Sequence, residues 1–252
     1  MKSYILLFLS IILTQSCSDL VEDLNNDPNN QTQSAYQTIL TGAEVGNMLF
    51  QTGENARRAC IFAGQYTGID RQHLGFSQYS VTTSDFDALW NDGYVDALRN
   101  AIITEEAANN ENIGPVTIGI TQVLQAQSFG TLTALYGDIP FDEAVNEDFP
   151  NPMFNNQVDV YSKIQTLLDK AISNLQQGSG KPAIGSDIYF DGNPQAWIES
   201  AYTLKARFYM HIKDYPKAYT AAQNGISSSD NNMYGPHGTA AEDFNLNYQF
   251  FD

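Results

Sequence analysis

Basic residues are scarce in this sequence. Its 252 residues include 12 Lys and Arg against 29 Asp and Glu, which gives a formal net charge of −17. A surface that follows a phosphate backbone needs clustered Lys and Arg, which this chain does not supply. Nucleic acid is therefore excluded as a partner, and so is a membrane surface held by charge alone. The acidic side chains are expected to form a solvated exterior that favours solubility.

Cysteine is also scarce, with one residue at position 17 and one at position 60. Cys60 stands between Ala59 and Ile61, and we interpret it as a small buried hydrophobic residue. Cys17 belongs to the N-terminal segment described below. A single thiol in the body of the chain cannot form an internal disulfide bond, so no disulfide framework is expected.

Motifs for catalysis and for metal binding are missing. The sequence contains no His-Glu-x-x-His, no Gly-x-Ser-x-Gly and no phosphate-binding loop. Asp138 with Asp142 and Glu143 could form the carboxylate pair of a glycosidase, but acids that form turns and caps are the favoured interpretation. The stretch from Asp230 begins like a calcium loop, but Ala241 occupies the position of the required bidentate Glu. We expect no enzyme, no metal site and no cofactor.

Long apolar runs are limited to Tyr4–Leu13, which is too short to span a bilayer. Lys2 precedes this run and Ser16-Cys17 follows it, so residues 1–16 are predicted to be a secretory signal. The arrangement resembles the lipobox of bacterial lipoproteins, in which the cysteine, here Cys17, is acylated. An ordinary cleavage site with a chance cysteine is the alternative. Residues 17–33 are rich in Asn and are predicted to be a flexible tether.

The stretch Gly114–Phe141 is the strongest structural signal in the remaining chain. Apolar residues recur there at steps of three and four, which predicts a buried helix. Pro115 suits a first helical turn, Gly137 suits the position after the last turn, and Pro140 prevents the helix from resuming. One part of its surface carries small residues that allow a neighbouring helix to approach closely: Ala126, Ser128, Gly130, Thr131 and Thr133.

Residues 34–252 are predicted to form one all-α domain of helix pairs with long irregular loops. Asn193-Pro194 and Asp214-Tyr215-Pro216 are clear helix starts. The pair around Trp197–Ile226 resembles a tetratricopeptide repeat, with Trp197 in its core and another helix stacked beside it. The other expected helices cover Ile39–Phe50, Ala56–Gln65, Trp90–Asn109 (with Ser84 as an N-cap before it) and Val160–Leu175. The expected irregular segments are 66–83, 141–157 and 181–192, and residues 244–251 alternate like a strand.

Two groups of residues are candidates for ligand binding. The segment 66–83 is rich in aromatic and polar side chains, and from it we select Arg71, His73 and Tyr79. Trp90 with Asn91 is the second group, because a flat ring can stack on a sugar while an amide pairs with hydroxyls. For Trp90 the alternative is a place in the helix core, four residues from Tyr94. For the loop residues it is packing against another part of the protein or a partner.

The order of these features resembles the SusD/RagB family of Bacteroidetes surface lipoproteins. The resemblance rests on Cys17, on the Asn-rich stretch 26–30 and on Trp90-x-x-x-Tyr94. It rests also on Leu135-Tyr136-Gly137-Asp138-Ile139-Pro140-Phe141 and on the run Trp197–Arg207. Because members of this family are normally longer, the chain is similar to an N-terminal portion. The resemblance implies an all-helical tetratricopeptide scaffold and a non-catalytic glycan-binding lipoprotein.

The same resemblance implies a partner and a location. It implies a SusC-like TonB-dependent transporter as partner, and an outer-membrane location at the cell surface through the lipid on Cys17 alone. Two other functions stay open at this point. One is a structural or protein-docking lid with no sugar ligand, because tetratricopeptide arrays commonly bind proteins. The other is a lipoprotein glycosidase.

Overall fold

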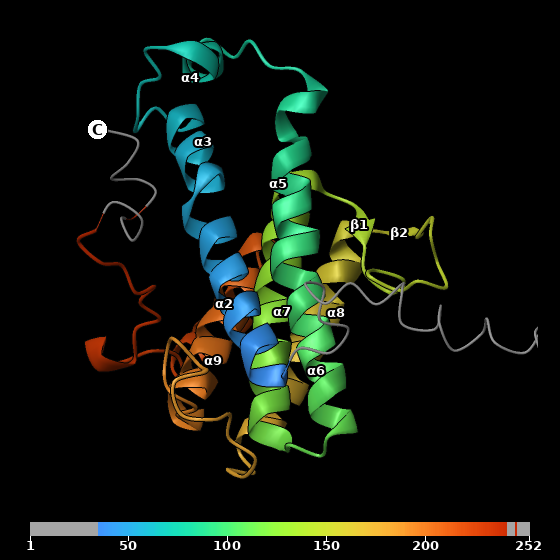
Figure 1. The fold of residues 1–252 in the computed structure, drawn as a ribbon. Coiled ribbons are helices and arrows are strands. Elements are labelled where there is room, and N and C mark those ends of the chain that lie inside the picture. The colour runs from blue at the N-terminus through green and yellow to red at the C-terminus, as the bar shows by residue number, and fades with distance from the viewer. Residues whose placement is uncertain (1–34, 241–244, 246–252) are drawn as a thin grey trace, which may run out of the picture. The chain divides into compact units, whose positions relative to one another are not determined.

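The computed structural model describes residues 35–240 and residue 245 and is shown in Figure 1. The predictions for residues 1–33 and for most of 244–251 lie outside this part. The helical elements are α2 (Tyr36–Thr52), α3 (Glu54–Phe62), α4 (Arg71–Ser77), η1 (Thr83–Phe86), α5 (Asp87–Asn91), η2 (Asp92–Arg99), α6 (Asn100–Asn110), α7 (Pro115–Tyr136), α8 (Gln157–Leu175), α9 (Pro194–His211), α10 (Tyr215–Ala222) and η3 (Ser229–Asn231). The strands β1 (Ile139–Pro140) and β2 (Phe154–Asn155) pair antiparallel. The fold is all-α, as predicted, and no described helix is long and apolar enough to cross a membrane.

Helix α7 is the centre of the packing, and α2, η2, α6, α8 and α9 all contact it. Almost every residue from Val116 to Thr133 is buried. The helix begins at Pro115 and ends before Gly137, whose φ of 81° suits glycine. Gly130 lies against α9, since a Cβ on it would lie 2.0 Å from the Phe208 ring. The predicted small surface therefore does allow a close helix–helix approach.

Elements α5, η2 and α6 form one continuous rod that contacts α2 and α7. Its middle section, η2, is a π-helix, a rare form often found near functional sites. The predicted N-cap, Ser84, is wrong by two residues. The N-cap is Thr82, whose backbone N–H donates to Asp85 Oδ2 at 2.7 Å. The reason is that the 3-10 turn η1 precedes α5 and moves the start of the helix upstream.

Helices α8, α9 and α10 pack in sequence, as expected for a tetratricopeptide-like pair with a neighbour. The side chains of Asn193 and Asp214 accept backbone N–H groups at the starts of α9 and α10. Trp197 is fully buried, and its Nε1 donates to Asp187 Oδ2 at 2.7 Å. The core position predicted for Trp197 is therefore confirmed.

A pair of buried carboxyl groups fixes the segment 181–192 against α2. Asp187 accepts the backbone N–H groups of Tyr189, Phe190 and Gly192 in addition to the Trp197 indole. Glu44, on α2, accepts the Ile188 N–H at 2.7 Å. Burial, followed by the nearby charge of Asp187, raises the pKa of Glu44 to about 10. Glu44 is therefore protonated in the folded protein at neutral pH.

Two local predictions are wrong. The segment 66–83 is not irregular throughout, because Asp70 caps the short helix α4 through a bond from the Arg71 N–H. Cys60 is partly exposed rather than buried, and its Sγ contacts Gln65 Oε1 at 3.5 Å. Helix α3 is short and lies beside α4 (Figure 1), so its outer face keeps contact with solvent.

Candidate functional site

A cavity of about 510 Å³ lies between α3, η1, α5 and the C-terminal end of α7. We call it the aromatic cavity. Its walls are mostly apolar and include three rings, with few polar groups among them. The lining residues are Asn55, Arg58, Ala59, Phe62, Thr83, Phe86, Leu89, Leu135 and Tyr136. The end of α7 contributes through Leu135, which is 45% exposed, because the chain turns at Gly137 and leaves this side open.

Arg58 holds the rings of the aromatic cavity in place. Its guanidinium lies 4.6 Å from the Phe76 ring centroid and 5.7 Å from that of Phe86, distances typical of cation–π contacts. It also pairs with Glu54 at 2.7 Å and donates to the backbone carbonyl of Asp85. With its charge neutralised by Glu54 and two of its nitrogens hydrogen-bonded, Arg58 acts as a support for the cavity wall.

Asn55 is the one amide side chain among the lining residues, and it is only 9% exposed. It stands in the first turn of α3, next to Glu54. Within residues 35–240 its side chain has no hydrogen-bond partner. Its amide atoms are not among the fully buried unpaired polar atoms of the described residues, so they keep solvent contact and remain available to a ligand in the cavity.

Trp90 stands beside the aromatic cavity and is half-buried. Its ring lies 5.0 Å from that of Tyr136, edge to face, and 4.7 Å from that of Tyr94. It also stacks on Phe154, which is 62% exposed, at 6.1 Å. One side of Trp90 thus packs against the core, and the other belongs to a ring cluster that reaches solvent, so a role of Trp90 in ligand binding stays a prediction. Asn91 next to it is exposed.

Tyr79, Arg71 and His73 lie on or beside α4. The Tyr79 ring is 70% exposed and stacks on Phe62, a wall of the aromatic cavity, at 5.9 Å. Arg71 extends into solvent and pairs with Asp70 at 3.7 Å. His73 is half-buried, with its ring edge against Phe76 at 6.0 Å. Tyr79 and Trp90 thus each contact a ring that lines the aromatic cavity, while Arg71 is exposed and pairs with Asp70.

Sequence reasoning missed the residues that line the aromatic cavity itself. Phe62 and Tyr136 are at helix ends, and Phe86 is in a 3-10 turn, so none of them follows a periodic pattern. Asn55 was missed because a single Asn in a helix start resembles any other polar residue. The available signal was the concentration of aromatic residues at the ends of three separate elements, where they do not belong to a helix stripe.

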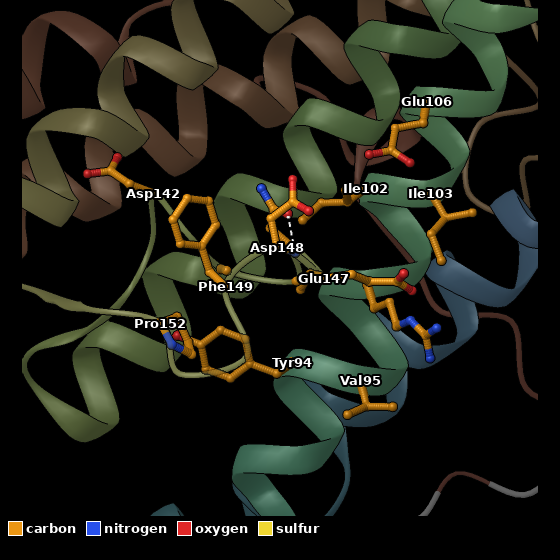
Figure 2. A pocket seen from close by; sticks show the side chains of 14 residues that line it. Tyr94, Val95, Ile102, Ile103, Glu106, Asp142, Glu147, Asp148, Phe149 and Pro152 are labelled. Carbon is orange, nitrogen blue, oxygen red and sulfur yellow. Dashed lines mark hydrogen bonds between the residues drawn. The ribbon is translucent and has the colours of Figure 1, made fainter.

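A second cavity, of about 760 Å³, has Tyr94 among its lining residues (Figure 2). We call it the acidic cavity. Val95, Ile102 and Ile103 on the η2–α6 rod form an aliphatic side, and the loop carrying Glu147, Asp148 and Phe149 faces them. The remaining lining residues are Tyr94, Arg99, Glu106, Asp142, Ala144, Val145, Asn146 and Pro152. Among the described residues, none forms an ion pair with Glu106, Glu147 or Asp148.

The acids considered for glycosidase chemistry hold the loop between β1 and α8. Asp138 accepts the Gln157 N–H at 2.8 Å, and Glu143 accepts the Met153 N–H at 2.7 Å. Asp142 accepts from Lys163 and from Asn155, and the bond from Lys163 lowers its pKa. A general acid needs a raised pKa, so these contacts favour the turn-forming interpretation. In the described part of the chain no cluster of His, Cys, Asp and Glu could hold a metal ion.

A comparison with models of protein families identifies the family of this chain. A family model described as "SusD-like_2: Starch-binding associating with outer membrane" matches residues 28–248. The chain therefore belongs to this SusD-like family. Among proteins of curated function, none matches the sequence closely enough to count as a relative.

Solved structures share the fold. A SusD/RagB family protein from Bacteroides thetaiotaomicron has a TM-score of 0.78 and 24% identity, over 87% of this chain and 48% of the other. A chitin-binding protein has a TM-score of 0.68 and 23% identity, over 79% and 45%. A SusD homologue from Bacteroides fragilis has a TM-score of 0.64 and 18% identity, over 84% and 45%. The chain thus spans about half the length of these structures.

Proposed function

We propose that this chain is a non-catalytic binding protein that captures a neutral oligosaccharide at the aromatic cavity. The observation that carries the proposal is the group of flat rings around one cavity, with Trp90 and Tyr79 beside it. Sugar rings have apolar C–H faces that bury area against such rings, while hydroxyls gain little by exchanging water for protein. The family description as starch-binding and one chitin-binding structural neighbour support the same ligand class.

We further propose that the ligand passes to a SusC-like TonB-dependent transporter of the outer membrane. The description of the family as associating with the outer membrane supports this role. In this proposal residues 1–16 are a signal peptide, Cys17 is acylated, and 17–33 tether the domain that begins at residue 34. No second function is proposed, since the acids that could serve a glycosidase are engaged within the loop.

Binding is tested by a glycan array followed by titration calorimetry on the purified protein. A neutral oligosaccharide should bind, and Trp90→Ala and Tyr79→Ala should weaken it more than Asn91→Ala or Arg71→Lys. If neutral glycans fail to bind across the array, the proposal is wrong.

The anchor is tested separately by cell fractionation. Cys17→Ala should release the protein from the membrane fraction and abolish labelling with a palmitate analogue. Ser16→Ala is the matched control, because a small residue remains before the cysteine, and it should stay membrane-bound. Continued labelling of the Cys17→Ala protein would contradict the proposed anchor.

A further inference from the structure

We propose that the aromatic cavity takes the N-acetyl group of a 2-acetamido sugar, so that the ligand is an N-acetylated oligosaccharide. This inference rests on the proposed function, because it names the class of glycan for the same site. Two observations support it: the unpartnered amide of Asn55 and the scarcity of other free polar groups in the cavity.

The few polar groups of the aromatic cavity limit which part of a sugar can enter. Arg58 is engaged by Glu54, by the Asp85 carbonyl and by two rings. Thr83 lies on the exposed turn η1, at the solvent side. A hydroxyl-rich sugar edge would therefore lose water without finding enough partners, and unpaired buried polar groups oppose binding strongly.

An acetamido group matches this cavity in both of its parts. Its methyl group is apolar and can bury its surface against Phe62, Phe86 and Leu89. Its amide offers one carbonyl acceptor and one N–H donor, and the Asn55 side chain offers a donor and an acceptor. One carbonyl–amide hydrogen bond would satisfy the Asn55 N–H that the described protein leaves unpaired. The sugar ring would then lie toward the cavity mouth, where Leu135 is exposed.

The experiment compares two neutral tetrasaccharides that differ only at C2. One is the β-1,4 tetramer of N-acetylglucosamine and the other is the β-1,4 tetramer of glucose. Titration calorimetry should give a Kd about tenfold lower for the acetylated tetramer, which corresponds to about 1.4 kcal/mol. Saturation-transfer NMR should give its strongest signal at the acetyl methyl protons.

Two variants assign the preference to the aromatic cavity. Asn55→Leu removes the amide at similar size, and it should leave thermal stability unchanged because the amide has no partner to lose. Asn55→Leu should also remove most of the tenfold difference in Kd between the acetylated tetramer and the glucose tetramer. Leu135→Arg, at a half-exposed position, should crowd the mouth and weaken acetylated tetramer binding without unfolding the protein. Met210→Arg on α9, which is 52% exposed, is the matched control and should bind normally.

The outcomes separate this inference from the function on which it rests. Equal affinity for both tetramers overturns the inference and leaves oligosaccharide binding standing. A preference for the acetylated tetramer that survives both Asn55→Leu and Leu135→Arg overturns the inference, because the group then binds elsewhere. Failure of every neutral oligosaccharide to bind overturns the proposed function together with it.

Discussion

The aromatic cavity and the acidic cavity lie along the same rod, α5–η2–α6, and differ in chemistry. The aromatic cavity is enclosed by Phe62, Phe86 and Tyr136, and its one cation is already neutralised. The acidic cavity has an aliphatic side, and three of its carboxylates, Glu106, Glu147 and Asp148, have no ion pair among the described residues. Trp90 contacts both Tyr136 of the first and Tyr94 of the second. The proposed function assigns the neutral sugar to the smaller aromatic cavity, because that cavity has fewer uncompensated charges than the larger acidic cavity.

The largest expected effect falls on the scaffold that supports both cavities. Trp197→Ala should lower the free energy of unfolding by about 3–5 kcal/mol, because it removes a fully buried ring. It should leave ligand affinity per folded molecule unchanged, since Trp197 lines neither cavity. Chemical denaturation and calorimetry at low temperature measure the two quantities. A stable Trp197→Ala protein that has lost only binding would show that this residue belongs to the site.

The next largest effect is the pH dependence of the free energy of unfolding, which should come from Glu44 and not from ligand binding. Glu44 has a folded pKa of about 10, above the unfolded value near 4.5, so the unfolded state binds fewer protons between these values. Its contribution to stability is therefore greatest below the unfolded pKa and falls as pH rises, by at most about 1.4 kcal/mol per pH unit. Glu44→Gln should flatten the decline between pH 5 and pH 9, measured by denaturant unfolding.

Oligosaccharide affinity provides the control for that pH experiment. A neutral sugar and the Asn55 amide do not titrate, so affinity should stay constant over the range in which stability declines. An unchanged stability slope in Glu44→Gln would contradict the assignment of the buried proton to Glu44. A pH-dependent affinity at constant stability would instead favour a ligand at the acidic cavity.

A smaller effect is expected at the ring that lies between the two cavities. Trp90→Ala should weaken oligosaccharide binding by about 1–2 kcal/mol, from lost apolar area at ~25 cal/mol per Å². Asn91→Ala, at an exposed neighbour, should change it by less than about 1 kcal/mol, the scale of one neutral hydrogen bond. Calorimetry on variants verified as folded measures both. If Trp90→Ala and Tyr79→Ala both bind normally, the ligand does not use the aromatic cavity.

The smallest effect is the response to salt, and it distinguishes the two cavities directly. Affinity for a neutral oligosaccharide at the aromatic cavity should change by less than about twofold between low and high salt, because no charges meet. A ligand held by Glu106 and Asp148 at the acidic cavity would lose affinity steeply as salt screens them. Titration calorimetry at two ionic strengths measures this salt dependence. A steep decline in affinity with salt would indicate a charged ligand.

Local patterns in the sequence were sufficient to place the main helices and to indicate the family. Apolar spacing at three and four residues placed α7, α8 and α9, and Pro115 and Asn193-Pro194 marked helix starts, because these signals act between near neighbours along the chain. The order of the short motifs was sufficient to identify the SusD-like family. Trp197 could be assigned to the core because Ala201, Leu204 and Phe208 follow it at helical spacing.

The packing of distant elements fixes which side chains share a cavity and which polar groups remain unpaired. Asn55, Phe86 and Tyr136 are far apart in sequence and meet only when α3, η1 and α7 pack together. The protonated Glu44 likewise depends on its burial against Asp187, a residue more than a hundred positions away. Periodicity reports the face that a residue presents, whereas pairing and burial depend on which distant element covers that face.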